Sequence, residues 1–261
     1  MNSSIPPFCH EMVEEARAYL DQLTKPPGSL GRLEEVAVEL AGMTGELHPR
    51  VTPPGVLVFA ADHGIAEEGV SAYPAEVTAQ MVYNFANGGA AINVFSRRID
   101  ALLEIVDVGV AVPIEDERVI VKKVRHGTGN FAKTEAMTPE EAEQALHVGY
   151  ERAARIIGQG ARTFIAGEMG IGNTTAASAL LATLTDEPLE HIVGKGTGIA
   201  AERLVHKQEV IRQALALHRP DPAKPIEWLA KIGGLEIAAM AGAMLAAAER
   251  RIPILLDGFI C

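Results

Sequence analysis

A glycine-rich stretch that follows an apolar strand offers the clearest chemistry in this sequence. It reads GEMGIGNTT and spans Gly167–Thr175. Gly170 and Gly172 allow the backbone to approach a ligand closely, and the free N–H groups at the start of the following helix favour an anion such as phosphate. The sequence therefore predicts an anion site here, with a tight structural turn from strand to helix as the alternative.

Glu168 helps to decide between these two interpretations. A carboxylate beside a phosphate site is repulsive unless it holds another group, such as a sugar hydroxyl. The glycine order is G-x-x-G-x-G and no Gly-Lys-Ser/Thr follows, so neither the dinucleotide-binding fingerprint nor the P-loop is matched. Asn173, Thr174 or Thr175 is expected to cap the helix with its side chain. Together these residues favour a ligand site over a plain turn.

Two other short motifs repeat the glycine theme. GKGTGI, at residues 194–199, precedes a helix that contains Lys207, and HGTGN spans residues 126–130. Each motif taken alone fits a plain turn better than a ligand site.

The motif ADHG, at residues 61–64, raises the question of a metal site because Glu67 and Glu68 follow it. It contains a single histidine, and His, Asp and Glu at such spacing recur by chance. Cys9 and Cys261, the two cysteines of the sequence, lack metal-ligand spacing and indicate a reducing compartment. We therefore predict no metal and no nucleophilic cysteine.

Composition describes an ordinary soluble globular chain, with 261 residues, 48% hydrophobic residues and a formal net charge of -11. This charge gives no long-range attraction to polyanions, and no basic cluster interleaves with aromatic residues, so nucleic acid is not expected as a partner. The first residues lack the pattern of a secretory signal. The longest apolar run, residues 237–248, is too short for a membrane span. We expect a cytoplasmic protein without membrane attachment.

The elements that position these residues alternate between strands and helices. Continuous apolar runs predict strands buried in a parallel sheet, and a 3.6-residue apolar period predicts helices. Strands are expected at residues 55–64, 101–110, 162–168 and 252–259, with a shorter and more exposed one at 118–125. Helices are expected at residues 10–24, 30–43, 74–85, 90–99, 138–160, 201–218 and 235–250, and in the small-residue segment after Thr175. The helix at 138–160 has the clearest signals, because a Thr cap, a Pro and a Glu open it and a Gly ends it.

This alternation predicts an α/β fold, a Rossmann-like parallel sheet with helices on both faces, over residues 51–261. The first strand would present Asp62 and His63 at its carboxyl end. Residues 1–50 contain helices alone, so they are expected to form a small helical cap packed beside the sheet.

Five stretches, spread in order along the chain, carry a family resemblance. They are KPPGSLGRLE from Lys25, ADHGIAEEGVSAYPAEVT around Asp62, NFANGGAAI from Asn84, GEMGIGNTT from Gly167, and KIGGLEIAAMAGAML with PILLDGF near the end. Together they resemble the nicotinate-nucleotide:dimethylbenzimidazole phosphoribosyltransferases of cobalamin lower-ligand assembly. The resemblance implies transfer of the 5-phosphoribosyl group of nicotinate mononucleotide to 5,6-dimethylbenzimidazole, giving α-ribazole 5′-phosphate and nicotinate. It implies no metal or redox cofactor, and a homodimer.

The resemblance also implies roles for the glycine-rich stretch. Glu168, Gly170 and the backbone of residues 172–174 fall where the family binds the ribose phosphate. Glu168 is then left for the sugar or the cationic nicotinate ring, in a supporting role. Lys207 is a second phosphate contact by this analogy, with a solvated lysine on a helix face as the alternative.

A second segment resembles the pocket in which the family holds its aromatic base. Tyr73, Pro74, Gln80 and Met81 are candidates for the walls of that pocket. The family often has a glutamine in this helix that contacts the base, and either Gln80 or Met81 could occupy its place.

Family members continue for about another quarter of the chain after LLDGF, and that part carries an LGEG loop whose glutamate is the general base of the family. This sequence stops at Cys261. Three interpretations stay open: a truncated family member, a chain completed by a second polypeptide, or a nucleotide-binding paralogue without catalysis. A chain without a positioned base is expected to turn over at least about 10²-fold more slowly while still binding the nucleotide.

Overall fold

The computed structural model describes residues 4–185, 187–196 and 198–261. Its centre is a parallel sheet whose strands follow the order β3-β2-β1-β4-β5. The strands are β1 (Pro54–Ala61), β2 (Leu102–Gly109), β3 (Val119–Val121), β4 (Thr163–Met169) and β5 (Ile254–Leu255). The α/β fold with a Rossmann-like sheet predicted from the sequence is confirmed, because this order is that of the doubly wound folds.

The middle of the sheet is formed by the apolar runs of the sequence. Every residue of β1 is buried, as expected for a strand covered on both faces. β1 lies between β2 and β4, so the strand order reverses at this point. In open parallel sheets, ligands bind outside the carboxyl ends of the strands where the order reverses. A ligand site is therefore expected among the residues that follow β1 and β4.

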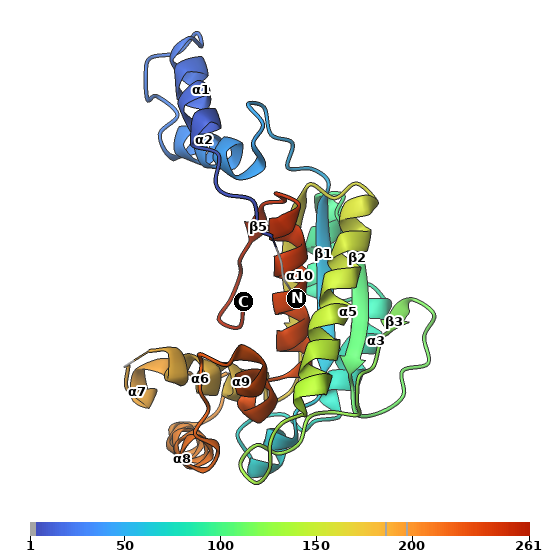
Figure 1. The fold of residues 1–261 in the computed structure, drawn as a ribbon. Coiled ribbons are helices and arrows are strands. Elements are labelled where there is room, and N and C mark those ends of the chain that lie inside the picture. Colours follow the sequence, from blue (N-terminus) through green and yellow to red (C-terminus); the bar gives the residue numbers. More distant parts are fainter. Residues whose placement is uncertain (1–3, 186, 197) are drawn as a thin grey trace.

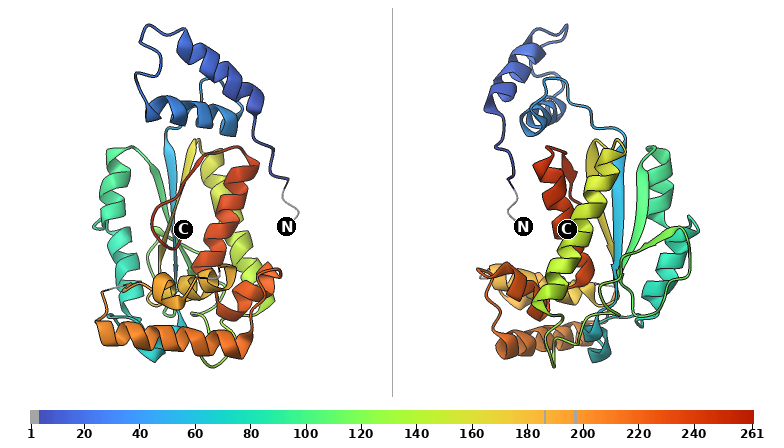
Figure 2. Two further views of the ribbon diagram at one scale, coloured as in Figure 1. Left: turned by 90° about the vertical axis from the view of Figure 1, so that its left-hand side faces the viewer. Right: turned by 45° about the vertical axis from the view of Figure 1, so that its right-hand side comes forward.

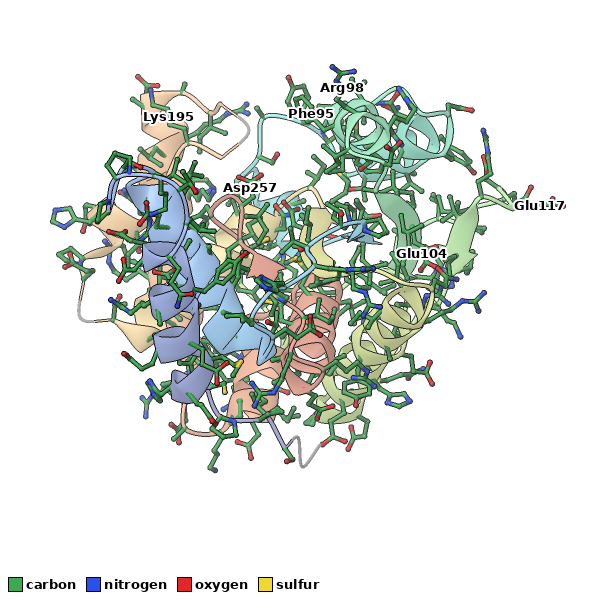
Figure 3. All side chains as sticks on the ribbon, turned by 90° about the horizontal axis from the view of Figure 1, so that it is seen from above. Phe95, Arg98, Glu104, Glu117, Lys195 and Asp257 are labelled. Carbon is green, nitrogen blue, oxygen red and sulfur yellow. The ribbon has the colours of Figure 1, made fainter. Side chains whose placement is uncertain are left out.

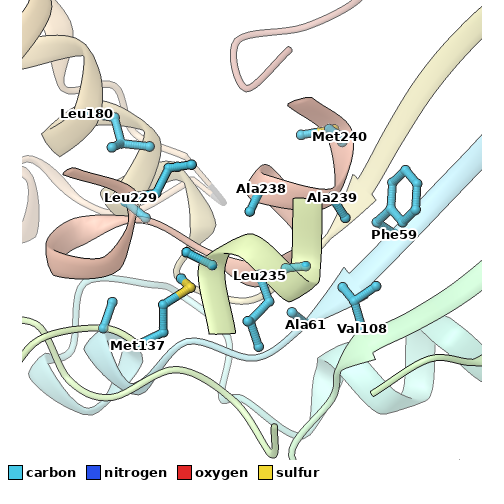
Figure 4. Close-up of a cluster of buried hydrophobic side chains, with 14 of the residues drawn as sticks. Phe59, Ala61, Val108, Met137, Leu180, Leu229, Leu235, Ala238, Ala239 and Met240 are labelled. Carbon is cyan, nitrogen blue, oxygen red and sulfur yellow. The ribbon is translucent and has the colours of Figure 1, made fainter. Parts of the chain in front are cut away.

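Helices cover both faces of the sheet (Figure 1 and Figure 2). On one face, α3 (Val77–Ala86) and α4 (Ala91–Arg98) pack against side chains that include Val58 and Ile105. On the other face, α5 (Pro139–Gly158) and α10 (Leu235–Glu249) pack over the side chains of Leu57 and Phe59. Figure 4 shows the core beneath α10, where Leu235, Ala239 and Met240 lie among the strand residues.

α5 and α10 are in backbone contact with each other. A methyl group on Gly149 of α5 would overlap the backbone of Ala239, and one on Gly242 of α10 would overlap the backbone of Leu146. The start of α5 is fixed by a capping box, since Thr138 accepts from the N–H of Glu141 while the Glu141 carboxylate accepts from the N–H of Thr138. This close helix pair gives the sheet one rigid cover.

Further helices lie at the carboxyl end of the strands, towards which the strand arrows point in Figure 1. They are α6 (Asn173–Leu184), α7 (Leu189–Ile192), α8 (Ala201–His218) and α9 (Pro225–Ile232). A short 3-10 helix, η1 (Gly64–Glu68), leaves the end of β1 in the same region. The carboxyl end of the sheet is thereby surrounded by chain, as a ligand site requires.

A pair of helices stands at the opposite, amino end of the strands (Figure 1). α1 (His10–Asp21) and α2 (Arg32–Thr44) pack on each other through a small core of Val13, Ala16, Val38 and Ala41. Residues 1–50 were predicted to form a small helical cap beside the sheet. The helix pair formed by α1 and α2 lies at the amino end of the strands, whereas α6–α9 lie at the carboxyl end.

Several element boundaries differ from the sequence prediction. The strand expected at residues 118–125 is limited to β3, and the one expected at 252–259 is limited to β5. β5 pairs with β4 alone, and Pro253 before it has no N–H to donate, so little pairing holds the rest of this segment. α7, α9 and η1 were not predicted. No helix in the described residues combines the length and the hydrophobicity that crossing a membrane requires.

Candidate active site

The carboxyl ends of β1 and β4 bring two distant parts of the sequence together. Phe59 of β1 is in register with Glu168 of β4, and Ala60 with Met169. The chain leaves β1 through Asp62 and His63, which are both buried. The GEMGIGNTT stretch and the ADHG motif therefore share one edge of the sheet, at the place where its strand order reverses.

The glycine turn adopts a conformation that its glycines make possible. Gly172 has φ 100°, in the left-handed region that side chains rarely adopt, and it is the N-cap of α6. A Cβ at Gly170 would lie 2.5 Å from the carbonyl oxygen of Ala61. The prediction that Asn173, Thr174 or Thr175 caps α6 is wrong, since no side chain of the described residues caps this helix. Among the described residues, no group accepts a hydrogen bond from the N–H of Thr174, so this N–H is available for an anion.

Glu168 is a mostly buried carboxylate beside this helix start. Its Oε2 accepts a hydrogen bond from the side-chain amide of Asn173, the first residue of α6. Burial, and then the nearby carboxylate of Glu236, raises the pKa of Glu168 to about 7, against the effect of the Asn173 bond. A carboxyl group with this pKa changes its charge within the physiological pH range, which is typical of functional sites.

Lys207 reaches the same helix start from α8. Its Nζ donates to Oγ1 of Thr174 at 2.8 Å, and the residue is 1% exposed. Burial lowers the pKa of Lys207 to about 8. The alternative of a solvated lysine on a helix face is wrong. At the start of α6, Thr174 thus accepts from the ammonium group of Lys207, and its neighbour Asn173 donates to the carboxylate of Glu168.

One buried ion pair in this region was missed by the sequence interpretation. Nε2 of His63 and Oε1 of Glu236 lie 2.6 Å apart, and neither side chain is exposed. Glu236 is in the first turn of α10. A signal existed in the sequence, because a carboxylate in a helix that is otherwise apolar on every side requires a buried partner.

The HGTGN turn joins the site through its backbone. The N–H of Thr128 donates to the carbonyl of Asp62, and the N–H of Gly64 donates to the carbonyl of Thr128. The Asp62 carboxylate accepts from the N–H of Ala111 at 2.7 Å. Burial raises the pKa of Asp62 above its usual range. This turn therefore braces the end of β1. GKGTGI lies before α8, and its Thr197 is outside the described residues.

The segment predicted to hold an aromatic base runs into α3. Tyr73 is 55% exposed, and Pro74 and Gln80 are also exposed. Met81 is half-buried and packs against the core under α3. Oγ1 of Thr78 accepts from the N–H of Ile171 at 3.1 Å, so α3 is tied directly to the glycine turn. This bond places the start of α3 next to the glycine turn.

The acidic pair after ADHG is occupied by interactions within the protein. Glu68 lies 2.7 Å from Nζ of Lys133 and accepts a hydrogen bond from Asn130 at 2.7 Å. Among the described residues, no group of three or more His, Cys, Asp or Glu side chains is arranged to hold a metal ion.

A large hollow of about 870 Å³ lies elsewhere in the described part of the molecule. Apolar side chains of α5, α6, α9, α10 and the last residues of the chain line it, and the lining includes neither Glu168 nor Lys207. We assign the site from its chemistry, since polar groups converge at the sheet edge and volume alone indicates no reaction.

Comparison with known proteins gives a family for this chain. A family model described as Phosphoribosyltransferase matches residues 5–261. The chain is similar to a protein of Halalkalibacterium halodurans named nicotinate-nucleotide--dimethylbenzimidazole phosphoribosyltransferase, with 53% identity over 247 residues, 95% of this chain and 69% of the relative. A protein of that name from Chloroflexus aggregans is 49% identical over 257 residues, 98% of this chain and 73% of the relative.

Solved structures agree with this comparison. The crystal structure of CobT from Thermus thermophilus superposes with a TM-score of 0.91 at 50% identity, and the match covers 96% of this chain and 75% of that one. The likeness therefore concerns the sequence as well as the fold.

Proposed function

Because the chain belongs to the nicotinate-nucleotide–dimethylbenzimidazole phosphoribosyltransferase family, we propose that it transfers the 5-phosphoribosyl group of nicotinate mononucleotide to 5,6-dimethylbenzimidazole. The chain is a transferase of this family, and the two relatives described above are named for this reaction. The products are α-ribazole 5′-phosphate and nicotinate. The observation that carries the proposal is the start of α6, where Thr174 accepts from Lys207 and Asn173 donates to Glu168.

The nucleotide is proposed to bind at the glycine turn. Its phosphate lies against the backbone of Gly170, Gly172 and Asn173, at the N–H of Thr174, with Lys207 as the cationic partner. Glu168 faces the ribose or the cationic nicotinate ring, and its ionised form stabilises the positive charge there. This arrangement explains why a carboxylate and an ammonium group both lie near one helix end, although burying each charge costs free energy.

The acceptor base is proposed to lie against the start of α3. Tyr73 and Pro74 offer apolar surface for a flat ring, and Gln80 or Met81 forms a further wall. The bond from Thr78 to the glycine turn supports this placement, because it keeps α3 beside the nucleotide.

The proposed reaction is a displacement at C1′ of the ribose. A ring nitrogen of the benzimidazole forms a bond to C1′ from the face opposite the nicotinate, whose C–N bond breaks with its electron pair passing to the ring nitrogen. The anomeric centre is inverted, and the benzimidazole loses the proton of its other nitrogen to solvent. Glu168 supports this step by stabilising the positive charge that develops on the ribose as the C–N bond breaks, whereas its contact with the cationic nicotinate ring would contribute to binding of the nucleotide.

The test is product formation from the two substrates. Incubation of the protein with nicotinate mononucleotide and dimethylbenzimidazole, in single-turnover amounts, is expected to yield α-ribazole 5′-phosphate and nicotinate in equal quantities by chromatography. Binding of the nucleotide without any product would contradict the proposed reaction and favour a nucleotide-binding protein.

We propose further that the protein acts as a homodimer in the cytoplasm, and that residues 1–50 and 51–261 are separate structural units. The family resemblance supports the dimer, and the separate cores of the two parts support the division. Sedimentation velocity tests the dimer, since a monomer at micromolar concentration would contradict it.

Substitution of Gly172 by valine is expected to raise the dissociation constant of nicotinate mononucleotide at least tenfold, or ~1.4 kcal/mol. The native φ of 100° is unfavourable for valine, and its Cβ would lie 3.2 Å from both His63 and Ile65. Isothermal titration calorimetry measures the change. Gly158→Val is the matched control, because Gly158 has open space around its Cβ position. Unchanged affinity in a folded Gly172→Val protein would contradict the prediction.

Substitution of Tyr73 by aspartate is expected to weaken acceptor binding while nucleotide binding stays close to its original value. A charged side chain disfavours a flat apolar ring, whereas the phosphate turn does not depend on Tyr73. Separate titrations with dimethylbenzimidazole and with the mononucleotide measure both affinities. Phe95→Asp on α4, where Phe95 projects at the edge of the molecule (Figure 3), is the control. A parallel loss of both affinities would show that Tyr73 has a structural role instead.

A further inference from the structure

His63 and Glu236 form a buried ion pair beneath the proposed nucleotide turn, and the proposed reaction assigns them no role. Their 2.6 Å contact connects the end of β1 with the first turn of α10. Removing two charges from water is expensive, and an apolar pair of similar size is often at least as stable. Stability alone therefore does not explain why this pair occupies the centre of the carboxyl edge.

The imidazole ring of His63 is enclosed by glycines from two other segments. A Cβ at Gly170 would lie 3.2 Å from Nε2 of His63, and one at Gly172 would lie 3.2 Å from its Cβ. A Cβ at Gly234, directly before α10, would overlap Cε1. The backbone of His63 also forms a parallel bridge with Thr128 in the HGTGN turn. His63 is thus the common packing partner of the glycine turn, the start of α10 and the HGTGN turn.

The pair also lies within the electrostatic field of the other site carboxylates. The carboxylates that face His63 are Asp62 at the end of β1, Glu168 on β4 and Glu236 on α10. Burial alone would lower the pKa of His63. The three carboxylates outweigh this effect, Glu236 most strongly, so the pKa of His63 is raised overall. In turn, Glu236 raises the pKa of Glu168 and His63 lowers it. The charges of the pair and of Glu168 are therefore coupled.

We propose that His63 and Glu236 are a positioning pair that fixes the glycine turn against the end of β1 and sets the charge with which Glu168 meets the nucleotide. The pair acts through Glu168 and through Gly170 and Gly172, without touching the substrate itself. The part that concerns the nucleotide rests on the proposed function, whereas the coupling to Glu168 does not.

The coupling is tested by following the carboxyl ¹³C resonance of Glu168, assigned by its loss in Glu168→Gln, between about pH 5 and pH 9. Glu236→Gln keeps the shape of the side chain but removes a negative charge and, with it, the main group that keeps His63 protonated. Because Glu236 affects the pKa of Glu168 more than His63 does, the titration midpoint of Glu168 is expected to fall. His63→Gln removes the cation and leaves Glu236 charged, so the midpoint is expected to rise. A purely structural pair would move neither midpoint.

Glu104→Gln is the matched control, because Glu104 also forms a largely buried ion pair, 2.6 Å from Arg152. Glu104 lies beside α5 (Figure 3), and it is in register with Leu57, in the middle of β1 and before the carboxyl edge of the sheet. This variant is expected to lose stability while the midpoint of Glu168 stays unchanged. Circular dichroism establishes that each variant is folded, and if His63→Gln fails to fold, Glu236→Gln decides alone.

A second measurement connects the pair with the nucleotide. Glu236→Gln is expected to change the pH dependence of nicotinate mononucleotide affinity by the same shift as the carboxyl titration, whereas Glu104→Gln keeps the wild-type profile. Identical titrations in Glu236→Gln and wild type would overturn the proposal. If the wild-type protein does not bind the nucleotide, the proposed function fails, and the carboxyl titrations still decide the coupling.

Discussion

Replacing Glu168 with glutamine is expected to remove most of the pH dependence of nicotinate mononucleotide binding around neutral pH. In the wild-type protein the pKa of Glu168 is about 7, so its carboxylate forms between about pH 6 and pH 8. An ionised Glu168 attracts the cationic nicotinate ring, so affinity should rise across this range. In Glu168→Gln the rise should vanish, and the dissociation constant at about pH 8 should be roughly tenfold higher than in the wild type.

The same substitution should change the pH dependence of stability. A folded-state pKa above the unfolded value means that the native protein binds more protons, so stability falls as pH rises from about 4.5 to about 7. Glutamine removes this loss of stability, which is on the order of 3 kcal/mol.

Calorimetric titration measures the change in nucleotide affinity, and urea unfolding at several pH values measures the change in stability. The exposed Glu117 at the rim of the molecule (Figure 3) supplies the control, Glu117→Gln. A Glu168→Gln protein with the wild-type binding profile would show that Glu168 does not meet the ring.

Replacing Lys207 with methionine is expected to make the protein more stable and a poorer binder. Burial lowers the pKa of Lys207 to about 8, so the native protein holds this charge at a cost below that pH. Stability of the wild type should therefore rise between about pH 8 and pH 10.5, where the unfolded chain binds more protons. Methionine removes the charge and keeps the packing, which should stabilise the protein by up to about 3 kcal/mol at neutral pH.

The loss of binding in Lys207→Met follows from the loss of a charged donor. Hydrogen bonds to charged groups contribute about 1.5–3 kcal/mol, so the dissociation constant of the mononucleotide should rise roughly tenfold to hundredfold. Lys195→Met removes an exposed lysine from the loop before α8 (Figure 3) and should change neither quantity. Thermal unfolding measures the change in stability, and calorimetric titration on the same preparations measures the change in affinity. A destabilised Lys207→Met protein with normal affinity would mean that Lys207 has a structural role.

The fold could be predicted from the sequence because its signals are local. The strands β1, β2 and β4 are rich in apolar residues, and α5 carries its own cap and end signals. The position of Glu168 at a sheet edge followed from the strand that it ends. The helix α7 was not predicted, because its four residues are too few to show an apolar period. The helix α9 was also missed, although Pro225 at its start is a signal for the beginning of a helix.

The site could be predicted less completely because it depends on long-range contacts. The partner of His63 is 173 residues away in sequence, and no local pattern connects the two. The burial of Lys207 had a weak local signal, since Val210, Ile211 and Ala214 follow it at helical spacing and are buried on the same face. The capping prediction at α6 was wrong, because the side chains of Asn173 and Thr174 are used by Glu168 and Lys207.

The backbone contact between α5 and α10 also limits how this sequence can vary through evolution. A methyl group at Gly149 or Gly242 would overlap the backbone of the other helix, so larger residues cannot replace these glycines unless the helices move apart. Glu236 lies less than two turns before Gly242 on α10, within about 9 Å along the helix. A shift of α10 by the width of a methyl group would stretch the 2.6 Å contact between Glu236 and His63 beyond hydrogen-bonding distance. With the proposed role of the His63–Glu236 pair, substitutions at this helix crossing are expected to lower ligand affinity as well as stability.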